Sequence, residues 1–292
     1  MIPLAAAVAG AVLGPTVLHP HRDALSREEL NDARAGFSMV GAVPQDVTVR
    51  ASDGAVLRGW KVPAPHPKGA WVLLLHGRSH NRTAMLPYAK LLLNAGYGVV
   101  MMDARNQGAS GGSMSTYGLL ERQDSRVIVD HLESSEGASH IFALGESMGA
   151  AVALQDGSDD PRIEAVVAEG AFRNLREVTF DYAGLQLSAT LGKTLFRPTA
   201  IVADFEAQHE GGFRFEDVSP ERAVAARSFP ILLICGLSDT KIPCRHSEAI
   251  YAHAIGPKQL WEVPGAGHQK AIVVAPEEFR RRVLDFFASA GH

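Results

Sequence analysis

The chain has 292 residues, of which 46% are hydrophobic and 21% are charged, and its formal net charge at pH 7 is −4. This composition is typical of a globular protein, and it shows no basic excess that would indicate a nucleic-acid partner. The sequence contains two cysteines, Cys235 and Cys244. We expect both to be free thiols, so they do not indicate an oxidising compartment.

Residues 1–18 carry no charged side chain. As a helix they would extend about 27 Å, slightly less than the roughly 30 Å of a bilayer's hydrocarbon core. We therefore expect residues 1–22 to form a separate apolar segment that anchors the protein at a membrane, as a transmembrane helix or the remnant of a signal segment. The alternative is a helix that packs on the domain of a cytoplasmic protein, because the segment is rich in alanine and contains Pro3 and Pro15.

Short apolar stretches alternate with longer amphipathic stretches from residue 46 onward. Residues 46–51 and 56–62 alternate like strands on either side of a turn that contains Gly54, which predicts an antiparallel hairpin. Six further strands are expected at residues 70–76, 97–103, 140–145, 163–170, 229–236 and 258–264. Helices are expected at residues 82–96, 119–134, 150–154 and 276–289. This alternation predicts an α/β fold with a mostly parallel, eight-stranded sheet and helices on both of its faces.

Residues 173–228 interrupt this alternation, because they separate two predicted strands by far more than the roughly dozen residues of an ordinary crossover. Their first part is apolar at helical spacing, so we predict a helical insertion at about residues 173–216 that acts as a lid over the sheet's carboxyl edge. An extra helical layer without a gating role is the alternative. Phe180, Tyr182 and Phe196 would either line an acyl pocket or form the core of the insertion.

The stretch "ALGESMGAAV" (143–152) places a serine between a predicted strand and a predicted helix. Such a tight turn forces its central residue, Ser147, into a sparsely populated backbone conformation and exposes the hydroxyl group at the carboxyl edge of the sheet. Ligands of open parallel sheets bind at this edge. Gly145 and Gly149 lack the β-carbons that would clash in the turn. We therefore predict that Ser147 is a nucleophile.

A serine hydroxyl group is a weak nucleophile until a base takes its proton. His268 follows the predicted strand at 258–264 and lies in a loop of small residues. An imidazole there can reach across the edge of the sheet, and its ordinary pKa suits proton transfer near neutral pH. We predict that His268 is the general base.

A carboxylate must hold the imidazole in the right tautomer, and Asp239 follows the predicted strand at 229–236. Asp103 and Glu169 also end predicted strands. We interpret Asp103 as a residue that shapes its own loop and favour Asp239 as the acid. Serine, aspartate and histidine then follow one another along the chain in an order that is typical of one class of hydrolases.

An oxyanion hole would complete this site. One donor is expected to be the backbone N–H of Met148, directly after the serine. The second is expected in the loop "HGRSHN" (76–81), where His76 and Gly77 support a close backbone approach and the N–H of Arg78 donates. Asn81 would brace this loop or cap the helix that follows it.

These residues together resemble the α/β-hydrolase superfamily, over roughly residues 46–290. The resemblance is carried by the motifs "HG" (76–77), "DARNQGASGG" (103–112), "GESMG" (145–149), "GLSDTKIP" (236–243) and "GAGH" (265–268). It implies an α/β-hydrolase domain at residues 40–292, and the same triad of serine, aspartate and histidine. The opening "DGAVLRGWKVP" is similar to a branch that includes monoacylglycerol-lipase-like and serine-aminopeptidase-like hydrolases. Arg78 departs from the pattern, because an apolar residue often follows "HG" in the family.

The sequence predicts a serine hydrolase that cleaves carboxylic esters through an acyl-enzyme, with a small-molecule substrate and without a metal or other cofactor. The same triad in an aminopeptidase or amidase, acting on an amide substrate, is one alternative. A hydrolase-fold binding protein that has lost its chemistry is the other. Residues 1–18 would provide any association with a membrane.

Overall fold

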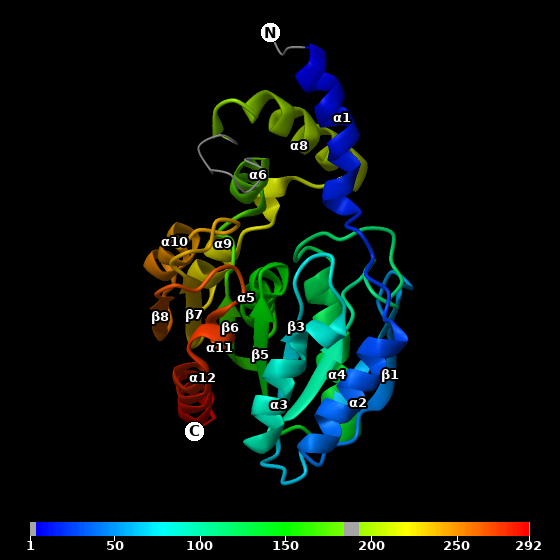
Figure 1. Cartoon of the computed structure of the whole chain (residues 1–292), viewed down its shortest axis with the longest axis vertical. Helices are drawn as coiled ribbons and strands as arrows, with labels where there is room; N and C mark the ends of the chain where they lie inside the picture. Colours follow the sequence, from blue (N-terminus) through cyan, green and yellow to red (C-terminus); the bar gives the residue numbers. More distant parts are fainter. Residues whose placement is uncertain (1–3, 184–192, 292) are drawn as a thin grey trace.

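The computed structural model describes residues 4–183 and 193–291, and these build an α/β structure around one sheet (Figure 1). The strands are β1 (Gln45–Arg50), β2 (Val56–Val62), β3 (Ala70–Leu75), β4 (Gly98–Met102), β5 (His140–Glu146), β6 (Ile163–Glu169), β7 (Ile231–Gly236) and β8 (Lys258–Val263). Their order in the sheet is β1-β2-β4-β3-β5-β6-β7-β8. Strand β2 pairs antiparallel with both β1 and β4, and all other neighbouring strands pair parallel. The predicted eight-stranded, mostly parallel sheet is confirmed.

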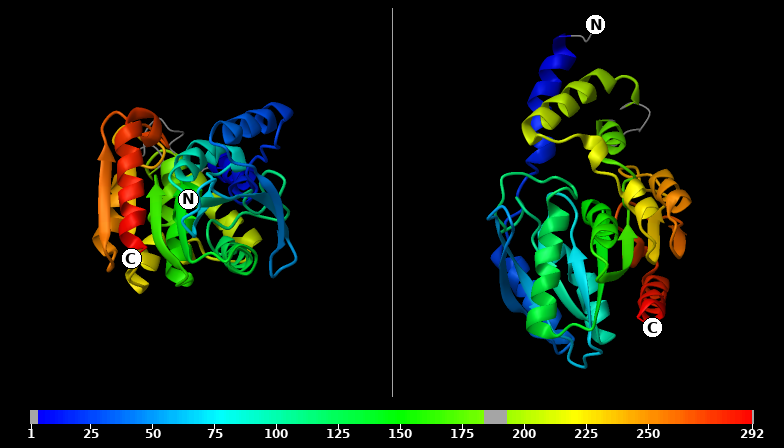
Figure 2. Two further views of the ribbon diagram at one scale, coloured as in Figure 1. Left: turned by 90° about the horizontal axis from the view of Figure 1, so that it is seen from below. Right: turned by 180° about the vertical axis from the view of Figure 1, so that it is seen from behind.

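Helices cover both faces of this sheet. The helices are α1 (Leu4–Leu18), α2 (Arg27–Met39), α3 (Leu86–Asn94), α4 (Glu121–Glu136), α5 (Met148–Asp159), α6 (Leu175–Ala183), α8 (Arg197–Gly211), α9 (Pro220–Ala226), α10 (Arg245–His253), α11 (Ala271–Val274) and α12 (Pro276–Ala290). Short 3-10 turns occur at Arg82–Met85 and Phe215–Asp217. Figure 1 shows α2, α3 and α12 on the near face, and the rear view in Figure 2 shows α4 and α5 on the opposite face.

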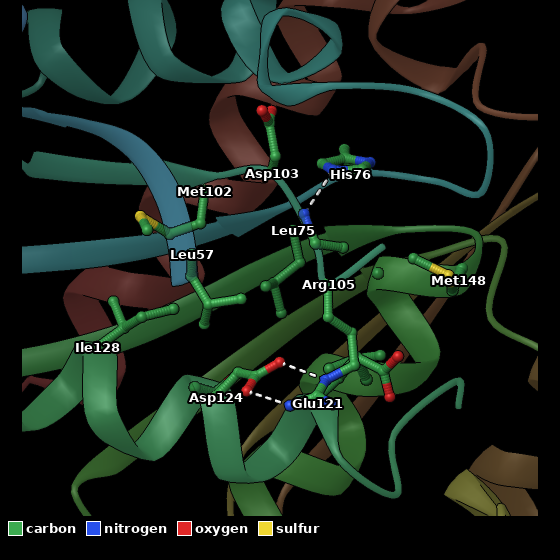
Figure 3. Close-up of a pocket in the computed structure, with 14 residues that line it drawn as sticks. Leu57, Leu75, His76, Met102, Asp103, Arg105, Glu121, Asp124, Ile128 and Met148 are labelled. Carbon is green, nitrogen blue, oxygen red and sulfur yellow. Dashed lines mark hydrogen bonds and ion pairs between the residues drawn. The ribbon is translucent and has the colours of Figure 1, made fainter. Parts of the chain in front are cut away.

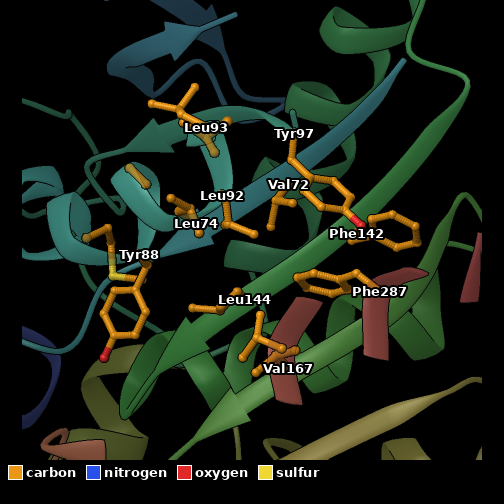
Figure 4. Close-up of a cluster of buried hydrophobic side chains, with 14 of the residues drawn as sticks. Val72, Leu74, Tyr88, Leu92, Leu93, Tyr97, Phe142, Leu144, Val167 and Phe287 are labelled. Atoms are coloured by element: carbon orange, nitrogen blue, oxygen red, sulfur yellow. The ribbon is translucent and has the colours of Figure 1, made fainter. Parts of the chain in front are cut away.

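Alternate side chains of the central strands feed two separate apolar layers. On β3, Val72 and Leu74 pack toward α3 and α12, whereas Trp71 and Leu73 pack toward α4 and α5. Figure 4 shows the first layer, with Val72 and Leu74 among side chains from α3 and α12. Burial on both faces explains why these strands are continuous apolar runs rather than alternating ones.

Two helices differ from the expectation in instructive ways. The predicted helix at 82–96 is a 3-10 turn followed by α3, and Pro87 lies in the first turn of α3, where its missing N–H is not needed. Helix α2 was not predicted, although its start is a capping box. The Ser26 hydroxyl accepts from the Glu29 amide at 3.1 Å, and the Glu29 carboxylate accepts from the Ser26 amide at 2.8 Å.

The helices of the insertion, α6 and α8, lie with α1 beyond the carboxyl edge of the sheet (Figure 1). Residues 184–192 of the predicted insertion lie outside the described residues. Whether the insertion gates the site stays a prediction.

Helix α1 packs along α8, as the alternative to an anchor had it. Two glycines permit the close approach, because a β-carbon at Gly10 would lie 2.5 Å from Val202 Cβ and one at Gly14 would lie 2.6 Å from Glu206 Cβ. Among residues 4–183 and 193–291, no helix combines the length and apolar character needed to cross a membrane. Other kinds of association between this segment and a membrane stay a prediction.

The two cysteines form a disulfide, so the expectation of free thiols is wrong. Cys235 lies at the end of β7 and Cys244 directly precedes α10, and the loop between them returns so that their Cα atoms lie 5.4 Å apart. This separation falls within the range that a disulfide can bridge. The bond closes a short loop, residues 236–243, at the carboxyl edge of the sheet.

We predict that the double variant Cys235→Ala, Cys244→Ala loses free energy of unfolding. For a sequence separation of nine residues, the loop-closure entropy amounts to about 2–3 kcal/mol. Urea denaturation without reductant measures this loss, and dithiothreitol should cause a comparable loss in the wild type but none in the variant. Two titratable thiols in denatured, unreduced wild type would contradict the disulfide.

Candidate active site

Ser147 occupies the turn between β5 and α5 with φ +54° and ψ −116°, a conformation that residues with a side chain rarely adopt. The turn is tight on both sides. A β-carbon at Gly145 would overlap the Gly149 carbonyl group, and one at Gly149 would overlap the Leu75 carbonyl group. The Ser147 amide donates to the Glu169 carbonyl oxygen at 2.8 Å, which ties the turn to β6. The expected strained turn is therefore present.

The structure brings the three predicted side chains together in one chain of hydrogen bonds. His268 Nε2 lies 2.9 Å from Ser147 Oγ, and His268 Nδ1 lies 2.6 Å from Asp239 Oδ2. Because an ionised carboxylate can only accept, Nδ1 carries the proton and Nε2 is free to accept from the serine hydroxyl group. All three side chains are almost completely buried.

Asp239 lies in the disulfide-closed loop after β7 and is held from its other side. Its Oδ1 accepts hydrogen bonds from the backbone amides of Lys241 at 2.8 Å and Ile242 at 2.9 Å. These bonds fix the orientation of the carboxylate, so that Oδ2 points at the imidazole. The competing acid Asp103 is engaged elsewhere, because it pairs with the guanidinium of Arg82 and accepts from the Ala109 amide.

The loop after β3 lies against the serine. A β-carbon at Gly77 would lie 3.4 Å from Ser147 Cβ and only 2.6 Å from Gln269 Nε2, so a side chain there would collide with Gln269 rather than with the serine. The side chain of His76 braces this loop, since Nδ1 donates to the Gly77 carbonyl oxygen at 2.7 Å. Its Nε2 accepts from the Ala104 amide at 2.9 Å, the bond that leaves His76 as a dashed line in Figure 3. Burial lowers the pKa of His76, which keeps the ring neutral as this arrangement requires.

The two amides expected to form the oxyanion hole border this region. Met148 is the first residue of α5, where a backbone N–H has no partner within its own helix. Arg78 follows Gly77, and among the described residues no hydrogen bond from its amide is present. Asn81 serves both of the roles considered for it, because Oδ1 caps the following turn through the Thr83 amide and Nδ2 donates to Glu29.

A cavity of about 500 Å³ opens onto Ser147. Its described lining comes from α1, α6 and α8 on one side and from the loops at the carboxyl edge on the other. Of the three aromatic residues singled out in the insertion, Tyr182 and Phe196 line the cavity, whereas Phe180 does not. Burial raises the pKa of Tyr182 to about 12, so its hydroxyl group stays protonated in the cavity that Ser147 also lines.

The contribution of α1 to this cavity was not predicted from the sequence. Ala9, Leu13, Thr16 and Val17 line it, and they recur at helical spacing. This spacing could have indicated which face of α1 lines a cavity, but the other faces of α1 are also apolar, so no single face is distinguished in the sequence.

A buried pair of carboxyl groups lies directly behind the serine. Glu146 precedes Ser147, and Glu169 ends β6; the hydroxyl group of Tyr88 lies 3.3 Å from Glu146 Oε2 and 3.0 Å from Glu169 Oε2. Burial raises the pKa of Glu146 to about 8, with a smaller contribution from the neighbouring Glu169. Burial also raises the pKa of Glu169. The pair therefore holds a proton near neutral pH.

We predict that Glu146→Gln reduces the pH dependence of stability. The folded state retains a proton on Glu146 up to a pKa of about 8, whereas the unfolded state releases it near 4.5. Stability from this group is therefore complete below pH 4.5 and falls as the pH rises to about 8, by at most about 1.4 kcal/mol per pH unit. We expect urea unfolding at pH 5, 6.5 and 8 to show that the free energy of unfolding of the variant increases relative to that of the wild type as the pH rises.

The exposed carboxyl of Glu248 provides the control, because Glu248→Gln should follow the wild type at every pH. Parallel pH profiles for wild type and Glu146→Gln would show that Glu146 does not hold this proton.

Comparison with known proteins gives consistent results. Residues 72–282 match the model of the alpha/beta hydrolase family. The uncharacterised protein YqkD of Bacillus subtilis is 29% identical over 238 residues, which cover 80% of this chain and 75% of YqkD. The uncharacterised protein Rv2307c of Mycobacterium tuberculosis is 30% identical over 245 residues, which cover 80% of this chain and 78% of Rv2307c.

Among solved structures, the Pyrococcus furiosus esterase Pf2001 aligns with a TM-score of 0.75 and 25% identity, covering 94% of this chain and 100% of that one. A Pyrococcus horikoshii acylaminoacyl peptidase aligns with a TM-score of 0.65 and 19% identity, covering 85% of this chain and 42% of that one, and so shares the fold. The family match spans more than half of the sequence and includes the serine, the aspartate and the histidine. The chain belongs to the alpha/beta hydrolase family.

Proposed function

We propose that this protein is a serine hydrolase that cleaves carboxylic esters through an acyl-enzyme. The observation that carries the proposal is the hydrogen-bond chain from Asp239 through His268 to Ser147, which ends at an apolar cavity. A buried imidazole that accepts from a serine hydroxyl group is the arrangement that activates serine as a nucleophile. The similarity to a protein described as an esterase supports the proposal.

The reaction would proceed in two halves. His268 Nε2 takes the proton of Ser147 as Oγ attacks the ester carbonyl carbon, and the negative charge forms on the carbonyl oxygen. The amides of Met148 and Arg78 donate to that oxygen. His268 then protonates the departing alcohol oxygen, leaving the acyl group on Ser147. A water molecule, deprotonated by His268, attacks the acyl-enzyme, and the acid is released as Ser147 regains its proton. Asp239 stays ionised throughout and holds the imidazolium.

The lining of the cavity favours an ester with an apolar acyl group over an aminopeptidase substrate. An aminopeptidase must bind a free ammonium group, for which a carboxylate is the ordinary partner. Among the described residues that line the cavity none is acidic, and the one charged side chain is that of Arg78, which would repel an ammonium group. Amide cleavage and a binding protein without chemistry are the alternatives that the experiment below separates.

We predict that a fluorophosphonate probe labels the wild-type protein and does not label Ser147→Ala. Hydrolysis of short p-nitrophenyl esters should fall in the same variant by a factor on the order of 10⁶ in kcat, since the nucleophile and its base act as a unit. Labelling is read by fluorescence after electrophoresis, and the labelled peptide is identified by mass spectrometry.

Ser238→Ala is the matched control, because Ser238 is an exposed serine next to Asp239. It should label and turn over like the wild type. Labelling of Ser147→Ala, or an unlabelled wild type, would refute the proposed mechanism. If the protein cleaves aminoacyl amides faster than esters, the proposed substrate class would be amides instead of esters.

A further inference from the structure

We propose that helix α1 forms the wall of the acyl-binding cavity and limits the acyl group to a linear chain of about eight to ten carbons. This rests on the proposed ester hydrolysis and adds the substrate class. The N-terminal segment, which by composition alone suggests an anchor, would then be a specificity-determining part of the active site.

One side of the cavity is formed by α1. Ala9, Leu13, Thr16 and Val17 line it from α1. The opposite wall comes from α6 and α8, including Val178, Ala200 and Ala203, and Ser147 lies among the lining residues at the sheet edge. The volume of about 500 Å³ lies in the range of natural small-molecule sites. Because the lining is mainly apolar, it fits the hydrocarbon part of an ester.

Two sets of contacts hold α1 in this position. Along its length, Gly10 and Gly14 let it pack closely on α8. At its carboxyl end, the side chain of Arg78 donates to the Thr16 carbonyl oxygen at 2.6 Å, and the Tyr117 hydroxyl group donates to the Val17 carbonyl oxygen at 2.5 Å.

These bonds satisfy carbonyl groups that have no partner within the helix, and the guanidinium complements the negative end of the helix dipole. The guanidinium also donates to the Tyr117 hydroxyl group at 3.0 Å, which links the two contacts. The Leu18 carbonyl oxygen accepts from the Ser115 amide at 2.8 Å and from the Asn106 side chain at 3.3 Å. The unusual Arg78 thus joins the end of α1 to the loop whose amide we assign to the oxyanion hole.

The length of the acyl chain follows from the helix geometry. Arg78 and Tyr117 fix the Thr16–Val17 end of α1 beside the catalytic loops, and Ala9 lies eight residues away, or about 12 Å along the axis. A saturated chain extends about 1.25 Å per carbon, from a C–C bond of about 1.5 Å. A chain that starts at the serine and runs along α1 to Ala9 therefore has about eight to ten carbons.

The first measurement is kcat/KM of the full-length wild type for p-nitrophenyl esters from acetate to hexadecanoate. Each methylene buried in the cavity should raise kcat/KM by up to about fourfold, which corresponds to about 0.8 kcal/mol. We expect this rise to end at eight to ten carbons and the rate to fall for longer chains. A flat profile, or one that still rises at sixteen carbons, would overturn the inference.

The second measurement uses Ala9→Trp, which adds bulk at the cavity-lining residue of α1 that lies farthest along the helix from its Thr16–Val17 end. It should lower kcat/KM for decanoate about tenfold or more through KM, because about two methylenes lose their burial, and this loss should be several-fold larger than any loss for the acetate ester. Ala11→Trp makes the same exchange at an exposed residue of α1 that does not line the cavity. This control should retain the wild-type profile. An unchanged profile in Ala9→Trp, or the same change in both variants, would refute the role of α1.

Leu13→Ala keeps the inference testable should the tryptophan variant fail to fold. Leu13 lines the cavity and is half exposed, so its truncation should be tolerated and should shift the preference toward longer chains. No shift in this variant would count against the inference. Fluorophosphonate labelling of Ser147 in every variant separates the two proposals. A labelled protein with the wrong chain-length profile refutes only the role of α1, and an unlabelled wild type refutes the proposed function itself.

Discussion

The backbone conformation of Ser147 is the constraint on which the rest of the site depends. A positive φ at a residue with a side chain is unfavourable, so the surrounding structure must impose it. Two features do so here: α5 begins at the next residue, and the flanking Gly145 and Gly149 allow backbone groups to approach where a β-carbon would overlap them. The parallel sheet then brings the acid and the base to the serine. Because β5, β7 and β8 run in the same direction, the loops that follow them meet at one edge, and Asp239 and His268 reach the serine from strands that are distant in sequence.

Buried polar groups below this edge keep the loops in place. The neutral ring of His76 bridges the Gly77 carbonyl group and the Ala104 amide, and so connects the loops after β3 and β4. The carboxyl pair of Glu146 and Glu169 connects β5 and β6 to α11, since Glu169 accepts from the Ala271 amide at 2.9 Å. An unpaired buried charge would be strongly unfavourable, and here the raised pKa of the carboxyl groups and hydrogen bonds from neighbouring groups reduce that cost. These bonds tie the loops that carry the site to the strands and to α11.

Local patterns were sufficient to predict the sheet, the strained turn and the residues that meet at its edge, because strand ends are readable from runs of apolar residues and their order along the chain. The disulfide was not predictable in this way, since a separation of nine residues says nothing about whether the loop returns on itself to bring two Cα atoms within bridging distance. The position of Tyr182 in the cavity that Ser147 also lines depends on how the insertion folds back over the edge, which no local pattern encodes. Similarly, the sequence shows that Arg78 departs from the family pattern, but not that its side chain donates to the carbonyl group of Thr16 in a distant helix.

The N-terminal helix shows why composition alone could not identify its position. Lining an apolar cavity and entering a bilayer require the same property, a helix surface without charged groups, so the sequence of residues 1–18 is consistent with either. Gly10 and Gly14 lie one turn apart and let the backbone of α1 approach α8 closely, which stabilises a helix packed against protein through contacts that lipid would not provide as specifically. The carbonyl groups at the end of the helix then find donors in Arg78, Tyr117 and Asn106. A helix held at both its face and its end lines, together with α6 and α8, the cavity that opens onto Ser147.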